Sequence, residues 1–143
     1  MTPAGARGEA ALRLHHVQLS CPPGGEGLAR RFWAEGLGLA EVEKPPALRP
    51  RGGAWFRSHD GGGAIVAEIH VGVEDPFVSA RRAHPALLLA DLAALEATGA
   101  RLETLGFEVD HRERHTFAGY ERLHVRDGHG TRVELLAEAA ARH

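Results

Sequence analysis

The segment LHHVQLSC, residues 14–21, begins a pattern that the chain later repeats. Polar and apolar residues alternate along it, which predicts a β-strand. The turn sequence PPGG at 22–25 ends this strand, and apolar residues spaced three to five apart predict a helix over 26–37. Two further strands are expected at 53–57 and 64–71, on either side of a glycine-rich turn. Prolines 45, 46 and 50 bound a loop or an edge strand between the helix and these strands.

The same order of elements begins again after a polar connection. A short apolar strand is expected at 86–90, and Asp91 is suited to cap a helix that runs to Leu105. Gly106 fits the position just after that helix. Three more strands then follow, at 107–110, 122–126 and 132–137. Each half of the chain therefore has a strand, a helix and three strands.

Shifting the chain against itself supports a duplication. At an offset of 68, six of 23 positions are identical, whereas composition alone would give about one or two. The offset slips to 67 in the Asp-Gly turns and to 66 in the last strands, as loop changes after a duplication would produce. The sequence predicts an α+β protein made of two tandem βαβββ modules. We expect tails at 1–12 and 138–143, and a single domain at 13–137 with modules at 13–75 and 83–137 and a linker at 76–82.

Composition narrows the classes of function. The 143 residues suffice for one domain, and 17 basic residues against 19 acidic ones leave no basic excess for nucleic acid. A single cysteine cannot form an intrachain disulfide, and no apolar run is long enough for a membrane span or a signal peptide. We therefore expect a cytoplasmic protein whose partner is a small molecule, with no nucleic acid and no membrane.

Histidine and glutamate recur at matching places in the two halves. His16 and His84 lie on the first strand of each half, and Glu68 and Glu134 on the last. Two imidazoles and two carboxylates suit a divalent ion such as Zn²⁺, Ni²⁺, Co²⁺, Mn²⁺ or Fe²⁺. His70 is two residues from Glu68, hence on the same strand face, and is the alternative fourth ligand. The competing interpretation is that these are ordinary strand and surface residues.

Several segments resemble the vicinal oxygen chelate superfamily, which is the glyoxalase/bleomycin-resistance/dioxygenase group. They are LHHVQL (14–19), FW (32–33), GLGL (36–39), KPP (44–46), RGGAWF (51–56), IHVGVE (69–74), AHPAL (83–87) and RVELL (132–136). The resemblance implies an open, barrel-like sheet around a cavity, formed within one chain or across a homodimer. It carries the family's metal positions onto His16, His84 and Glu134. One departure is the turn DGHGT at 127–131, where the family pattern has a proline and an asparagine.

The expected activity follows from this resemblance. It implies a metal-dependent lyase, isomerase or epimerase acting on a small oxygen-chelating substrate, with Glu134 and Glu68 as catalytic carboxylates. The alternative is a metal-free protein that binds a small molecule or an antibiotic, as the bleomycin-resistance branch does. Only 6% of the residues are aromatic, which counts against a broad aromatic groove. Candidate substrate contacts are Trp55, Phe56, Arg57, His70, His124 and Arg122.

Overall fold

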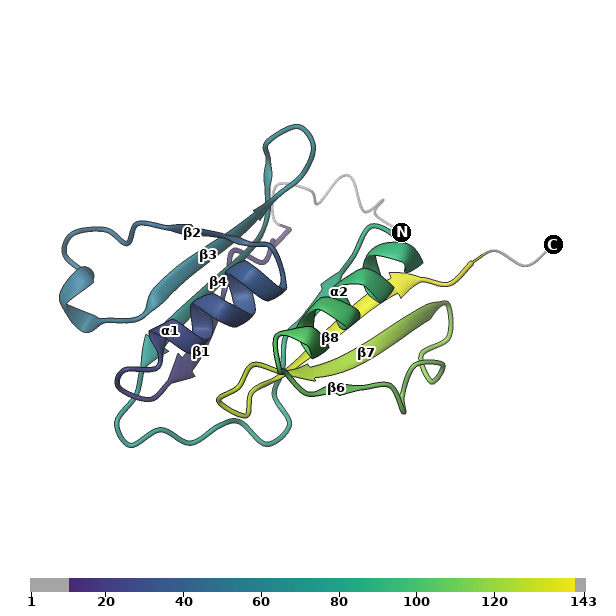
Figure 1. Cartoon of the computed structure of the whole chain (residues 1–143). Coiled ribbons are helices and arrows are strands. Elements are labelled where there is room, and N and C mark those ends of the chain that lie inside the picture. The colour runs from purple at the N-terminus through teal and green to yellow at the C-terminus, as the bar shows by residue number, and fades with distance from the viewer. Residues whose placement is uncertain (1–10, 141–143) are drawn as a thin grey trace.

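The computed structural model describes residues 11–140 (Figure 1). The predicted tails lie largely outside this range. The elements in chain order are β1 (Val17–Cys21), α1 (Glu26–Arg30), η2 (Arg31–Gly36), β2 (Ala40–Val42), η3 (Arg49–Arg51), β3 (Ala54–His59), β4 (Ile65–Val73), β5 (Ala86–Leu88), α2 (Leu92–Thr104), β6 (Val109–Asp110), β7 (Tyr120–Arg126) and β8 (Arg132–Glu138). The order strand, helix, three strands occurs twice, as predicted.

Each module forms its own four-stranded mixed sheet. The strand orders are β1-β4-β3-β2 and β5-β8-β7-β6. In each sheet the first strand runs parallel to the last strand of its module, and the other pairs are antiparallel. The two sheets lie side by side and do not close into a barrel (Figure 1). The predicted α+β fold with an open sheet is confirmed.

Two details of the first module differ from the sequence prediction. The single helix expected over 26–37 widens after Arg30 into the π-helical turn η2, which buries the adjacent residues Phe32 and Trp33 together. The edge strand β2 comes before Pro45 and Pro46, and Pro50 lies within the short 3₁₀ turn η3. Among residues 11–140, no helix is both long and apolar enough to cross a membrane.

The core lies between the sheets and the helices, and it joins the two modules. Phe32 of the first module packs edge to face on Phe107 of the second, with ring centroids 5.1 Å apart. Along β4, Ile69 and Val71 enter this core, so the residues that alternate with them point to the opposite face. β8 follows the same rule, with Leu135 in the core. We call the face of each sheet that points away from the helices its open face.

Candidate metal centre

Three side chains of the second module gather on its open face. His84, His124 and Glu134 each offer a ligand atom, and these atoms lie within 4.8 Å of one another. Glu134 and His124 sit directly opposite each other on β8 and β7, and His84 comes just before β5. Nε2 of His84 is 3.2 Å and Nε2 of His124 is 3.3 Å from the same oxygen, Oε1 of Glu134. We call these three residues the second ligand group.

The chemistry of the second ligand group fits a metal ion. Nδ1 of His84 lies 2.7 Å from the carbonyl oxygen of Arg82, to which it can only donate a hydrogen bond. In the neutral ring, Nε2 then carries a lone pair and faces the carboxylate oxygen of Glu134. Two acceptors face each other, so a cation or a proton between them is required. A histidine held by a backbone carbonyl in this way is the usual arrangement of a metal ligand.

Glu134 is charged although only 5% of its surface is exposed. Burial raises the pKa of its carboxyl, but the contact with His84, the charge of Arg122 and the contact with His124 outweigh it, and the pKa lies below its ordinary value. Nη1 of Arg122 is 3.4 Å from Oε1 of Glu134. The carboxylate is therefore available as an anionic ligand at neutral pH.

The first module has its own group on the open face of its sheet. His15, His16 and Glu68 offer ligand atoms that lie within 4.8 Å of one another, and we call them the first ligand group. Val17 of β1 pairs with Ile69 of β4, which places His16 level with Glu68. His15 was not among the sequence candidates. Its only signal was its place beside His16 in the HH pair.

Glu68 is surrounded differently from Glu134. It forms an ion pair with Arg57, which lies opposite it on β3, and its Oε2 lies 3.0 Å from Nε2 of His70. Burial raises the pKa of Glu68, but the hydrogen bonds of Arg57 and His70 outweigh it, and the pKa is below its ordinary value. The negative charge is thus already partly compensated by a cation of the same sheet.

His70 contacts Glu68 and is the middle ring of a stack of three aromatic rings. Its imidazole lies between Trp55, at a centroid distance of 3.8 Å, and His16, at 4.0 Å. Only 5% of His70 is exposed, and burial lowers its pKa, so the ring is neutral at pH 7. With Nε2 turned to Glu68, His70 orients that carboxylate.

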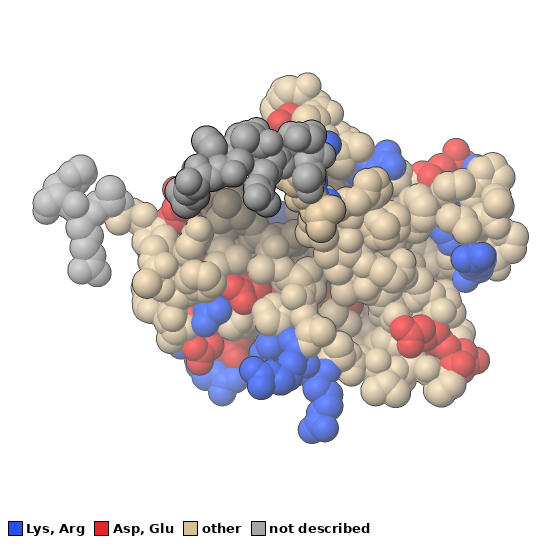
Figure 2. Space-filling model, turned by 180° about the vertical axis from the view of Figure 1, so that it is seen from behind, with Lys and Arg blue, Asp and Glu red and all other residues tan. Residues whose placement is uncertain are grey.

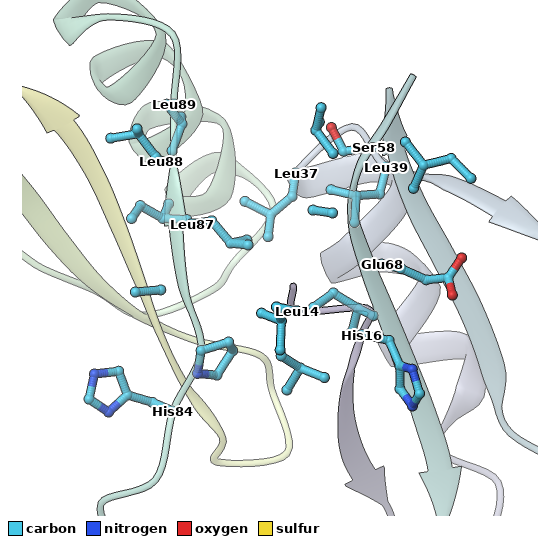
Figure 3. A pocket seen from close by; sticks show the side chains of 18 of the residues that line it. Leu14, His16, Leu37, Leu39, Ser58, Glu68, His84, Leu87, Leu88 and Leu89 are labelled. Atoms are coloured by element: carbon cyan, nitrogen blue, oxygen red, sulfur yellow. The ribbon is translucent and has the colours of Figure 1, made fainter. Parts of the chain in front are cut away.

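The two ligand groups flank a cavity between the modules. This cavity has a volume of about 730 Å³, and its lining includes His16, Glu68 and His84. In Figure 3 the side chain of Glu68 points to one side of the cavity and the ring of His84 points to the other. The structure therefore brings His16 close to Glu68 and His84 close to Glu134. Within one chain, the four predicted ligands form two separate groups among the described residues and not a single site.

The candidate substrate contacts divide between the open faces and the core. Trp55, Arg57 and His70 surround Glu68, whereas Arg122 and His124 contact Glu134. Phe56 lies on the opposite face of β3, is fully buried in the core and lines no cavity of the site. Sequence alternation shows that Trp55 and Phe56 face opposite ways, but only the packing decides which one is inside.

The unusual turn before β8 is well formed. Oδ1 of Asp127 accepts hydrogen bonds from the backbone N–H groups of His129 and Thr131, at 2.9 and 3.0 Å. Gly128 and Gly130 have φ values of +91° and +92°, which favour glycine. The Asp127 side chain and the two glycines thus shape this turn without the proline and asparagine of the family pattern.

Several proteins of known structure resemble this chain over most of its length. A putative glyoxalase family protein from Bacillus anthracis is 34% identical, covers 90% of this chain and 97% of its own, and has a TM-score of 0.76. Lactoylglutathione lyase from Agrobacterium tumefaciens (19% identity, 87% and 92% covered, TM-score 0.62) and TnmS3, an antibiotic binding protein from Streptomyces sp. CB03234 (18%, 90% and 99%, TM-score 0.61), share the fold. No curated protein matches in sequence. Because its family model matches residues 13–135, the chain belongs to the Glyoxalase/Bleomycin resistance protein/Dioxygenase superfamily.

Proposed function

We propose that this protein is a metal-dependent lyase, isomerase or epimerase that acts on a small substrate with adjacent oxygens. The observation that carries the proposal is the buried carboxylate of Glu134 within reach of two imidazoles. The ligands would be His84 and Glu134 together with His16 and Glu68. A bound divalent ion would supply Lewis-acid polarisation of the substrate oxygens. His124 and His15 complete the two groups as neighbouring imidazoles.

The protein's own part in the reaction is to move a proton. The contacts of His84, His124 and Arg122 with Glu134 all fall on Oε1. This leaves Oε2 as the oxygen that can accept a proton from a substrate carbon next to an oxygen. Glu134 would then return this proton to the product, while Glu68, also ionised in the other ligand group, would act as the base for a proton on the opposite side of the substrate. Because Arg57 and His70 hold Glu68, its position is fixed and its reach is short.

We further infer that the site is completed by a second copy of the chain. Within one chain the two ligand groups lie on different sheets and point away from each other (Figure 3). A homodimer in which the first module of one copy faces the second module of the other would bring one group to each side of a shared site. Two such sites would form per dimer, which amounts to one ion per chain.

A second candidate function is metal-free binding of a small molecule. The observation in its favour is the cavity of about 730 Å³, a size typical of ligand pockets. Its lining includes the exposed apolar side chains Leu14, Ile65, Val66 and Leu88. Exposed apolar groups of this kind mark a binding surface.

Metal content separates the two functions. Mass spectrometry on untagged protein should find one transition-metal ion per chain in the wild type and none in His16→Ala or Glu134→Ala, because each variant removes a ligand. His70→Leu should retain the ion with lowered affinity, because His70 orients Glu68 and is not itself a ligand.

The matched controls are His111→Ala and Glu103→Ala. These residues form an exposed His–Glu pair at 2.9 Å that belongs to neither ligand group, and their loss should leave the metal content unchanged. A wild type that holds no metal after incubation with Zn²⁺, Ni²⁺, Mn²⁺ and Fe²⁺ would contradict the enzyme proposal. Thermal-shift screening with small molecules would then test the binding function.

A further inference from the structure

A polar pocket of about 420 Å³ adjoins the second ligand group and contains two arginines that the metal site does not use. Arg126 of β7 and Arg132 of β8 are directly paired in register, two residues along from the pair His124 and Glu134. Because side chains alternate along a strand, these two pairs share the open face. Figure 2 shows the molecule from behind. Basic and acidic side chains lie close together on the half that the second module forms.

These two arginines form no ion pair among the described residues, although Glu108 and Glu113 also line the pocket. Arg112 in the same pocket is paired with Asp110, and Arg122 with Glu134. Among residues 11–140, no carboxylate lies within 4.0 Å of the guanidinium of Arg126 or Arg132. Like charges placed directly opposite each other on neighbouring strands are destabilising. An anion between the two would remove this cost.

Arg132 also has donors without acceptors. Its Nε is buried and has no hydrogen-bond partner among the described residues. Its Nη2 is 3.2 Å from Nδ1 of His84, but that nitrogen donates to the carbonyl of Arg82 and cannot accept as well. A buried donor left unpaired is destabilising. The remaining bonds of the pair go to backbone carbonyls, from Arg132 to Arg82 at 3.2 Å and from Arg126 to Gly130 at 3.0 Å.

We propose that Arg126 and Arg132 bind an oxyanion group of the substrate, namely a carboxylate, phosphate or phosphonate. Guanidinium groups bind such oxygens with paired, charge-assisted hydrogen bonds. The contact of Arg132 with His84 places this anion beside the second ligand group. The inference rests on the proposed function for the rest of the site, and it defines the substrate as an anion that also offers adjacent oxygens to the metal.

Anion binding can be measured without metal and without turnover. Chelator-treated protein at about pH 8, where ordinary histidines are neutral, is titrated calorimetrically with inorganic phosphate, methylphosphonate or acetate at constant ionic strength. We expect saturable binding of at least one probe, with affinity reduced about tenfold or more in Arg126→Gln and in Arg132→Gln. The preferred probe tells which oxyanion the pocket selects.

Two further variants control for the loss of charge and for misfolding. Arg49→Gln removes the same charge from an exposed ion pair of the first module and should bind the probe as the wild type does. Arg132→Lys keeps the charge but lacks Nε, so it should bind more weakly even if Arg132→Gln does not fold. The inference is wrong if no probe binds saturably, or if Arg49→Gln weakens binding as much as Arg126→Gln.

The outcome is independent of the proposed function. Metal content is measured on the same preparations, and Arg126→Gln should keep its ion. A protein that binds metal but no anion would overturn the inference and leave the proposed function standing. A protein that binds the anion but no metal would do the opposite.

Discussion

The two modules place a buried glutamate at corresponding points of their open faces, yet each module surrounds it differently. Glu68 is tied to Arg57 and to the ring stack of Trp55, His70 and His16. Glu134 faces the imidazoles of His84 and His124, with Arg122 at 3.4 Å. The first glutamate is held by Arg57 and His70, whereas the second lies among imidazoles that would share a metal ion with it.

The register of the strands differs as well. His16 lies level with Glu68, but in the second module Ala86, two residues after His84, pairs with Glu134. The duplicated strands have therefore shifted by two residues relative to each other, which keeps every side chain on its face. We therefore predict that the second module would provide most of the affinity for a metal ion, while the first would orient the substrate and stabilise the fold.

The largest expected effect tests this division directly. Glu134→Gln should lower Zn²⁺ affinity by about 100-fold or more, because a neutral amide replaces the main anionic ligand. Glu68→Gln should lower it by only about tenfold, because Arg57 already offsets that charge. Competition titrations against a chromophoric chelator give both values. Equal losses would mean that the two groups contribute alike.

The alternation of residues and the internal repeat predicted most of the residues that belong to the candidate site. They did not predict how these residues are arranged relative to one another. They placed Glu68 and His70 on the same face of a strand and matched Glu68 to Glu134, because parity along a strand is a local property. The ion pair of Glu68 with Arg57 depends on the register that the β3–β4 turn sets, and sequence did not give that register. The separation of the ligand groups depends on how the modules pack, which no local pattern encodes.

The same two substitutions should affect stability in the opposite order to metal affinity. In chelator-treated protein, Glu68→Gln should lower the free energy of unfolding by about 1–3 kcal/mol, because Arg57 and His70 lose a buried partner. Glu134→Gln should cost less. Glu43→Gln removes an exposed partner of Arg49 and should change little. Urea denaturation monitors all three, and a larger loss in Glu134→Gln would refute the proposed division of roles.

The smallest expected effect is on the loss of stability at low pH. The pKa of Glu68 and the pKa of Glu134 are both lowered in the folded state, so the unfolded chain binds more protons as the pH falls. Their contribution to stability is complete above about pH 4.3, the ordinary glutamate pKa, and is lost as the pH falls through the lower folded values. The melting temperature of Glu68→Gln/Glu134→Gln should fall less steeply below that pH. An unchanged slope would assign acid sensitivity to other groups.

A metal site shared between two copies of the chain can be tested with mixed dimers. One chain carries His16→Ala with Glu68→Ala, the other carries His84→Ala with Glu134→Ala, and the two are co-expressed with different tags. Neither chain has a complete ligand set, but a mixed dimer would contain one intact shared site and one site without ligands.

Metal analysis of the doubly purified mixed dimer gives the answer. We predict one ion per mixed dimer and none in either variant alone. No ion in the mixed dimer, with one ion per chain in the wild type, would show that each chain builds its site from its own two modules.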